Sequence, residues 1–214
     1  MHLFSKIREL IVKHIKNNFK SYFFLLLAFI VGVSAGAFTV NGLSSIQKDE
    51  LSNYFRGFLQ LLDNQKVDSG ELLKIALADN FKLIFALWVL GVTIIGIPFI
   101  FVLIGIRGFL TGFSSGFIIE LLGMKGALFT GLVLFPKEII VIPCFIALGV
   151  NGINFSMSII RSKSIRLLSK QNIKTKFIAY CFVTLFFSCF VFGGSLIEAY
   201  ITPVFIRLIA PLVS

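Results

Sequence analysis

The chain has 214 residues, of which 57% are hydrophobic and 14% charged, and its formal net charge is +10. A soluble domain of this length cannot bury so much apolar surface, and long apolar runs are typical of helical membrane spans. The composition therefore excludes an ordinary soluble domain. It predicts an all-α, polytopic helical membrane protein that forms one integral membrane domain over residues 1–214.

The first crossing follows a basic N-terminal segment. Residues 1–20 contain five basic residues against one acidic residue, and the next 27 positions, Ser21 to Gln47, carry no charge. A hydrocarbon core of about 30 Å needs about 20 apolar residues in a helix. We therefore expect a cytoplasmic segment over 1–20 and a first transmembrane helix over 21–43.

The segment 44–80 has an amphipathic pattern, because its apolar residues recur at spacings of three and four. One interpretation is a helix that lies in the membrane interface. The other is a docking surface for an extracytoplasmic partner, and both can hold together. The candidate docking residues are Leu51, Tyr54, Phe55, Phe58 and Leu62.

The longest uncharged stretch in the middle of the chain runs from Leu83 to Ile106. Its 24 residues would span about 36 Å as a helix, enough to cross a bilayer with some tilt. We expect a second transmembrane helix over 81–106. A third, shorter and rich in glycine, is expected over 107–123.

The remaining apolar runs predict two further crossings. A fourth helix is expected over 126–160, broken near 136–143 by Pro136 and Pro143. A basic loop follows over 161–176, then a fifth helix over 177–199 and a tail over 200–214. About five transmembrane helices result.

The positions of the basic residues predict the orientation. Eleven of the 20 basic residues lie in segments 1–20 and 161–176. Short basic loops stay in the cytoplasm, and the four crossings between these segments allow both to do so. We therefore expect a cytoplasmic N-terminus and an external C-terminus. The basic segments need no partner beyond anionic lipid headgroups, and nothing indicates nucleic-acid binding.

Small residues recur every four positions in the first and third expected helices, where they would allow another helix to approach closely. Packing within the chain is the default interpretation, and a homo-oligomer is the alternative. The candidate packing residues are Gly32, Gly36, Gly108, Gly112 and Gly116.

Ionisable residues inside the expected spans are costly in hydrocarbon and normally face a partner or a cavity. Arg107 is expected at the cytoplasmic boundary. We expect a polar cluster near the outer face, with Lys137 close to Glu120 or Glu198. Its candidate members are Glu120, Lys137, Glu138 and Glu198.

The sequence does not indicate an enzyme. The only histidines are His2 and His14, and the three cysteines have no metal-ligand spacing. The letters of Gly112–Gly116 match a nucleophile elbow, but they lie in an apolar helical run instead of a strand-turn-helix setting. We expect no catalysis, cofactor or metal. A small channel or transporter subunit is the alternative, because Gly91, Gly96 and Pro98 would interrupt the second span.

Several strings in the chain together resemble the stage II sporulation protein M family of endospore-forming bacteria. The resemblance covers nearly the whole chain in the same order. The matching strings are Val31–Asn41, Leu87–Gly91, Ile94–Pro98, Gly108–Phe117, Phe135-Pro136, Ile142-Pro143 and Glu198–Tyr200 with Pro203.

The resemblance implies a non-catalytic scaffold in the membrane, needed for forespore engulfment. Its partners would be stage II sporulation proteins D and P, which degrade septal peptidoglycan. The protein is expected to be a multi-pass protein of the cell membrane, located at the septum and in the engulfing mother-cell membrane. The segment Ser44–Asn80 is then the expected docking surface, since the cell wall lies on that side.

Overall fold

The computed structural model describes residues 15–64, 69–164 and 170–206, and no strand occurs among them. Five helical stretches are long and apolar enough to cross a membrane: Phe19–Asn41, Ser69–Val92, Gly96–Leu122, Met124–Arg161 and Ile173–Ile206. The expected all-α fold with five spans is thereby confirmed. The helices are α2 (Phe19–Asn41), α3 (Ser45–Asn64), α4 (Ser69–Val92), α5 (Gly96–Leu122), α6 (Met124–Phe129), the π-helix η1 (Thr130–Leu134), α7 (Phe135–Ser164), α8 (Lys170–Leu196) and the π-helix η2 (Ile197–Ile201).

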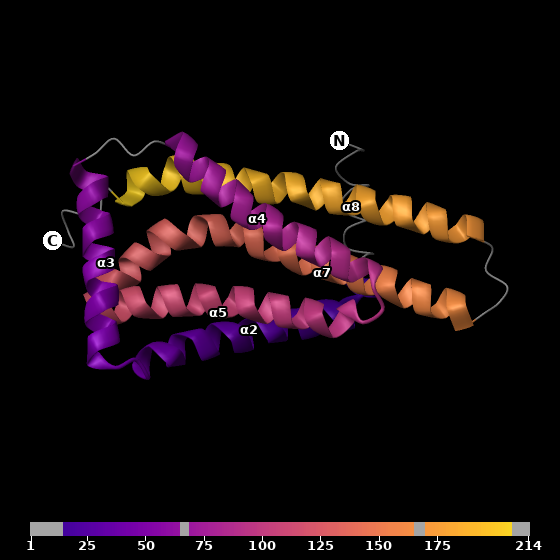
Figure 1. Cartoon of the computed structure of the whole chain (residues 1–214), viewed down its shortest axis with the longest axis horizontal. Coiled ribbons are helices and arrows are strands. Elements are labelled where there is room, and N and C mark those ends of the chain that lie inside the picture. Colours follow the sequence, from indigo (N-terminus) through magenta and orange to yellow (C-terminus); the bar gives the residue numbers. More distant parts are fainter. Residues whose placement is uncertain (1–14, 65–68, 165–169, 207–214) are drawn as a thin grey trace.

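The long helices run side by side along the long axis of the molecule, and α3 lies across one end of them (Figure 1). We call this the α3 end. The opposite end, where α4 turns into α5, is called the turn end. Helix α7 packs against α2, α4, α5 and α8. In the span Met124–Arg161, which contains α7, 56% of the apolar 18-residue stretch is buried, more than in any other span. Helix α7 is therefore the central helix of the bundle.

The expectation of one crossing over 81–106 is wrong, because the chain reverses at Thr93–Ile95. Gly96 closes this turn: a Cβ atom there would lie 1.9 Å from the carbonyl oxygen of Leu90. Pro98 then falls in the first turn of α5, where backbone N–H groups have no helical acceptor and proline is tolerated. The second span is α4 from Ser69, and the expected third helix is only the later part of α5.

Helices α2 and α5 run parallel and touch through their backbones. A Cβ atom on Gly32 would lie 2.1 Å from the carbonyl oxygen of Gly105, and one on Gly36 equally close to that of Phe109. From the other side, a Cβ atom on Gly112 would lie 2.0 Å from the carbonyl oxygen of Val33. Such close approach maximises van der Waals contact, which drives helix association in lipid.

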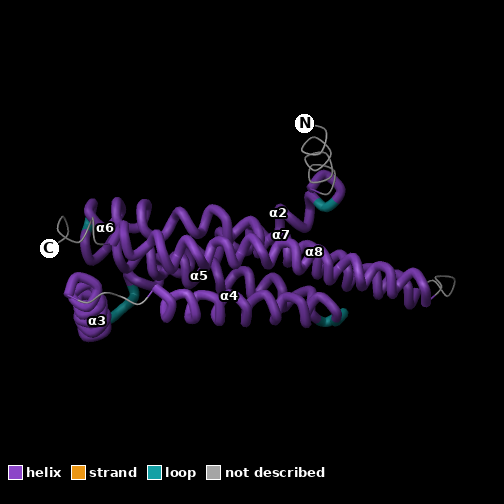
Figure 2. The backbone as a smooth tube through the Cα atoms, turned by 90° about the horizontal axis from the view of Figure 1, so that it is seen from above, coloured by secondary structure: helices purple, strands orange, loops and turns teal. Residues whose placement is uncertain are grey.

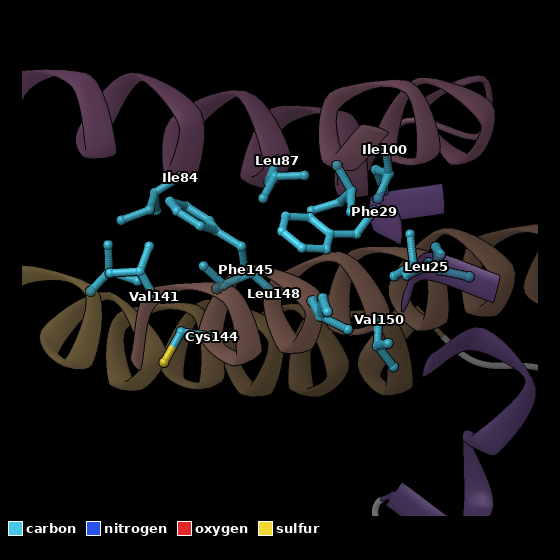
Figure 3. Close-up of a cluster of buried hydrophobic side chains, with 14 residues drawn as sticks. Leu25, Phe29, Ile84, Leu87, Ile100, Val141, Cys144, Phe145, Leu148 and Val150 are labelled. Carbon is cyan, nitrogen blue, oxygen red and sulfur yellow. The ribbon is translucent and has the colours of Figure 1, made fainter. Parts of the chain in front are cut away.

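The apolar core joins all five spans around α7 (Figure 3). Phe145 of α7 is almost fully buried, as are Leu87 of α4 and Ile100 of α5. Leu25 of α2 touches the same cluster, and Val191 adds a contact from α8. This cluster joins the five spans through apolar side chains alone.

A second apolar cluster seats α3 on the bundle. Phe55 of α3 meets Phe129 of α6 edge-on, with ring centroids 5.9 Å apart. Ile118 and Ile206 complete this cluster from α5 and from the segment after η2. Figure 2, turned by 90°, shows α3 at the same end of the bundle.

Candidate functional site: ion pairs and a cavity inside the bundle

Two ion pairs lie within the bundle, each joining different helices. Arg107 of α5 donates from Nη2 to Oε1 of Glu138 over 3.0 Å, and Lys137 of α7 pairs with Glu198 of η2. The side chains of Glu138 and Lys137 are only 9% and 15% exposed. Charged groups inside a membrane-spanning bundle are costly, so their presence needs a structural or functional reason.

The structure places Lys137 against Glu198, one of the two acidic partners expected for it. Glu120 instead binds Lys48, which ties the start of α3 to the end of α5. Glu138, adjacent to Lys137, faces Arg107. The four residues expected as one cluster therefore belong to three separate ion pairs.

Arg107 is not at a membrane boundary, contrary to expectation. With α5 beginning at Gly96, it lies about 16 Å along the helix axis, near the middle of the span. Its guanidinium lies 5.6 Å from the ring centroid of Phe145, in cation–π contact. The error follows directly from the missed turn at Thr93–Ile95.

Both π-helices of the described chain adjoin the Lys137–Glu198 pair. Each precedes a proline, Pro136 or Pro203, whose ring would clash in an α-helix with the carbonyl group four residues earlier. Those carbonyls belong to Leu132 in η1 and Ala199 in η2. Each proline also lacks a backbone N–H donor. The helix before it widens to i→i+5 hydrogen bonds, which accommodates the proline, and such π-bulges are frequent at functional sites.

A cavity of about 220 Å³ lies beside these pairs, in the half of the bundle nearer α3. The cavity is bounded by α4, by η2 and the turn after it, and by α5 and α7 at its inner side. Its polar lining residues are Asp79, Asn80, Arg107, Lys137, Glu198 and Thr202. The volume can hold several water molecules, at about 30 Å³ each.

A second polar network closes the turn end, and the sequence reasoning missed it. Ser156 donates to the carbonyl oxygens of Gly91 and Thr93 at 2.7 and 2.9 Å. The Tyr180 hydroxyl donates to the carbonyl oxygen of Trp88 over 2.8 Å. The last four carbonyls of a helix have no intrahelical donor, and the Ser156 hydroxyl satisfies that of Gly91. The Tyr180 hydroxyl ties α8 to the same end of α4. A serine and a tyrosine within largely apolar runs were the available signals.

The candidate docking face of α3 is divided between the bundle and the surface. Phe55 packs on Phe129, and Leu51 is half-buried. Tyr54 is 82% exposed. The side chains of Phe58 and Leu62 lie outside the described residues. Of the three members whose side chains are described, Tyr54 is the one exposed for a partner.

The remaining sequence candidates lie in helices. Gly112–Gly116 belongs to the interior of α5, so the nucleophile-elbow setting is not formed. Gly108, Gly112 and Gly116 all face α2, which occupies this surface within one chain. Among the described residues, no group of three or more His, Cys, Asp or Glu side chains could hold a metal ion.

The fold and the site together define a polytopic helical membrane protein with ion pairs and a polar cavity in its bundle. The family model for stage II sporulation protein M matches residues 25–203, so the chain belongs to that family and is a sporulation-related membrane protein. Comparisons with curated proteins and with solved structures gave no match.

Proposed function

We propose that the protein is a non-catalytic membrane platform for forespore engulfment, which anchors or localises septal peptidoglycan-degrading proteins. Its partners would be stage II sporulation proteins D and P, on the side of the membrane that carries α3. The family membership supports a role in sporulation. The observation that carries the platform role is α3 itself, a helix fixed across one end of the bundle with Tyr54 exposed.

The charge distribution supports placing the α3 end outside the cell. Segments 1–20 and 161–176 hold eleven basic residues, and along the chain they adjoin the start of α2, the end of α7 and the start of α8. Basic segments of this kind remain cytoplasmic. The engulfing mother-cell membrane and its septal precursor are the proposed location, with the α3 end directed toward the wall between the two cells.

The test is co-purification of the D and P proteins with variants of the exposed face of α3. Ile46 and Tyr54 are both more than two-thirds exposed and neither is needed to seat α3. We expect the double variant Ile46→Asp with Tyr54→Asp to lose co-purification while its amount in the membrane stays unchanged. Unchanged recovery of both partners would contradict the platform role.

The matched control is Ile95→Asp, an equally exposed position in the turn at the opposite end. This variant should retain both partners. If α3 only lies in the membrane interface, another result is expected: the double variant should lower the stability of the protein in the membrane without a selective loss of co-purified D or P protein. The two interpretations are separated by scoring thermal stability and co-purification on the same samples.

One observation favours the alternative, a small channel or transporter subunit: the charged cavity in the half of the bundle nearer α3. Ionisable residues inside membrane spans are often parts of ion or solute pathways. Solute flux in liposomes, combined with normal engulfment in a deletion strain, would support this alternative. Absence of flux together with blocked membrane migration would support the platform.

A further inference from the structure

The ion pairs around the cavity are not needed to hold the bundle together. The apolar core and the backbone contacts between α2 and α5 already join all five spans. Replacing a buried ion pair by apolar residues of similar size is often neutral or stabilising. Arg107, Lys137 and Glu198 nevertheless line one cavity, where a ligand could use their charges.

The two cations at the cavity wall have many unused hydrogen-bond donors. Lys137 carries three N–H donors and pairs with Glu198 alone among the described residues. Arg107 carries five and uses Nη2 for Glu138, while its Nε is buried with no partner in the described part of the chain. Both side chains line the same cavity.

The acidic groups nearby are engaged or lie elsewhere. Glu198 is held by Lys137, and Glu138 contacts Arg107 without lining the cavity. Asp79 does line the cavity, but it is two-thirds exposed and pairs with Lys82 on its own helix. The inner wall therefore carries two cations, each paired with one carboxylate, and of these two carboxylates only Glu198 lines the cavity.

We propose that this cavity binds an oxyanion group, a phosphate or a carboxylate, between Lys137 and Arg107. Arginine and lysine donors are the usual partners of such groups, and charge-assisted hydrogen bonds are the stronger kind. The Thr202 hydroxyl adds a neutral donor at the same wall. The site does not depend on the platform role proposed above.

The position and size of the cavity are consistent with that ligand. A volume of about 220 Å³ accommodates a phosphate-sized group with a few water molecules. Glu198 is one-third exposed and Asp79 two-thirds exposed, so the ligand reaches the cavity past them. The group can be a free anion or the headgroup of an anionic lipid.

The test measures the thermal unfolding of the purified full chain in non-ionic detergent. Sodium phosphate and sodium acetate are titrated against sodium chloride at equal ionic strength, and dioleoyl phosphatidylglycerol against the matching phosphatidylcholine in mixed micelles. We expect a saturable upward shift in Tm of a few degrees with at least one anion, as ligand linkage requires. No saturable shift with any of them would overturn the proposal.

Variants separate this site from general salt effects, because phosphate also strengthens apolar burial in any protein. Lys137→Gln with Glu198→Gln removes the charges while leaving a neutral hydrogen-bonded pair, and it should abolish the shift. Lys48→Gln with Glu120→Gln makes the same change at the pair that ties α3 to α5, and it should keep the shift. A shift that persists in the first double variant would overturn the proposal.

A third variant keeps the proposal testable if the double variant Lys137→Gln with Glu198→Gln does not fold. Ala76→Leu fills the cavity from α4 without touching any charged residue, and it should weaken the response to the anion at least tenfold. An unweakened response in this variant, measured on folded protein, would overturn the proposal. A shift with inorganic phosphate or acetate identifies a soluble ligand, and a shift with phosphatidylglycerol alone identifies a lipid headgroup; either result supports the site.

Discussion

Arg107 Nη2 donates to Glu138 Oε1 over 3.0 Å and so joins the middle of α5 to the first turn of α7. Both side chains are largely buried, and Glu138 Oε2 has no further partner in the described part of the chain. Desolvating two charges is costly, and their mutual attraction repays that cost only while both are present. Loss of one partner should therefore harm the protein more than loss of both.

The first prediction concerns this pair. Arg107→Met leaves Glu138 as an uncompensated buried charge, and we expect the free energy of unfolding to fall by about 3–5 kcal/mol. The double variant Arg107→Met with Glu138→Gln should recover most of that loss. Thermal unfolding of the detergent-purified protein measures both. A single variant that is no less stable than the double variant would contradict the prediction.

The pair between Lys48 and Glu120 provides the comparison. About a third of each side chain is exposed, so the solvent screens their attraction. We expect Lys48→Met to lower the free energy of unfolding by no more than about 1 kcal/mol. A loss as large as that of Arg107→Met would show that position in the bundle does not decide the effect.

The second prediction concerns the contact between α2 and α5. A Cβ atom on Gly112 would lie 2.0 Å from the carbonyl oxygen of Val33, and a backbone atom cannot move aside alone. We expect Gly112→Ala to lower the free energy of unfolding by about 1–3 kcal/mol by forcing the two helices apart. Thermal unfolding, with size-exclusion chromatography to confirm folding, measures the loss.

Gly193 of α8 is the matched control, because no atom lies within 4 Å of a Cβ built there. Gly193→Ala should be neutral or slightly stabilising, since alanine restricts the unfolded chain and favours the helix. Equal destabilisation by both substitutions would contradict the packing argument.

The sequence was sufficient to predict the class of fold and the number of spans, because a long apolar run directly indicates a helix that lies in lipid. The glycines spaced by four also marked helix faces that the structure brings together, such as Gly32 and Gly112. Lys137 had two acidic candidates as partners. Choosing Glu198 requires knowing how α7 and η2 are oriented about their axes, and composition and spacing do not give that orientation.

The boundary of the second span could not be found by counting charges. The first turns of α4 carry Glu71, Lys74, Asp79 and Lys82, whereas the turn at Thr93–Ile95 carries no charge at all. The Ser156 hydroxyl of α7 and the backbone N–H of Gly96 donate to the carbonyls at this turn, so it needs no charged residues. Gly96 followed by Pro98 was the local signal of a helix start.

The third prediction concerns those hydroxyls. Ser156 is fully buried and donates to the carbonyl oxygens of Gly91 and Thr93 at the end of α4. Ser156→Ala removes the donor to the carbonyl oxygen of Gly91, whereas the carbonyl oxygen of Thr93 keeps the backbone N–H of Gly96. We expect a loss of about 1–3 kcal/mol in the free energy of unfolding. Thermal unfolding of the purified protein measures it.

Ser188 is the matched control for this change. Its hydroxyl donates only to the carbonyl oxygen of Thr184, four residues earlier in the same helix. That acceptor belongs to the helical hydrogen-bond ladder, so Ser188→Ala should change stability little. If both serine variants lose the same stability, the role assigned to Ser156 at the turn is wrong.

The last prediction concerns the orientation of the bundle. Tyr54 at the α3 end and Ile95 at the turn end are both well exposed, so a cysteine at either position should be accessible to an aqueous thiol reagent. In a background with Cys144, Cys181 and Cys189 replaced by alanine, we expect a membrane-impermeant maleimide to label Tyr54→Cys in intact protoplasts. Ile95→Cys should be labelled only after the membrane is permeabilised, because basic segments such as 1–20 and 161–176 are expected to keep the turn end in the cytoplasm. The reverse pattern would place α3 inside the cell and remove the basis for a docking surface facing the wall.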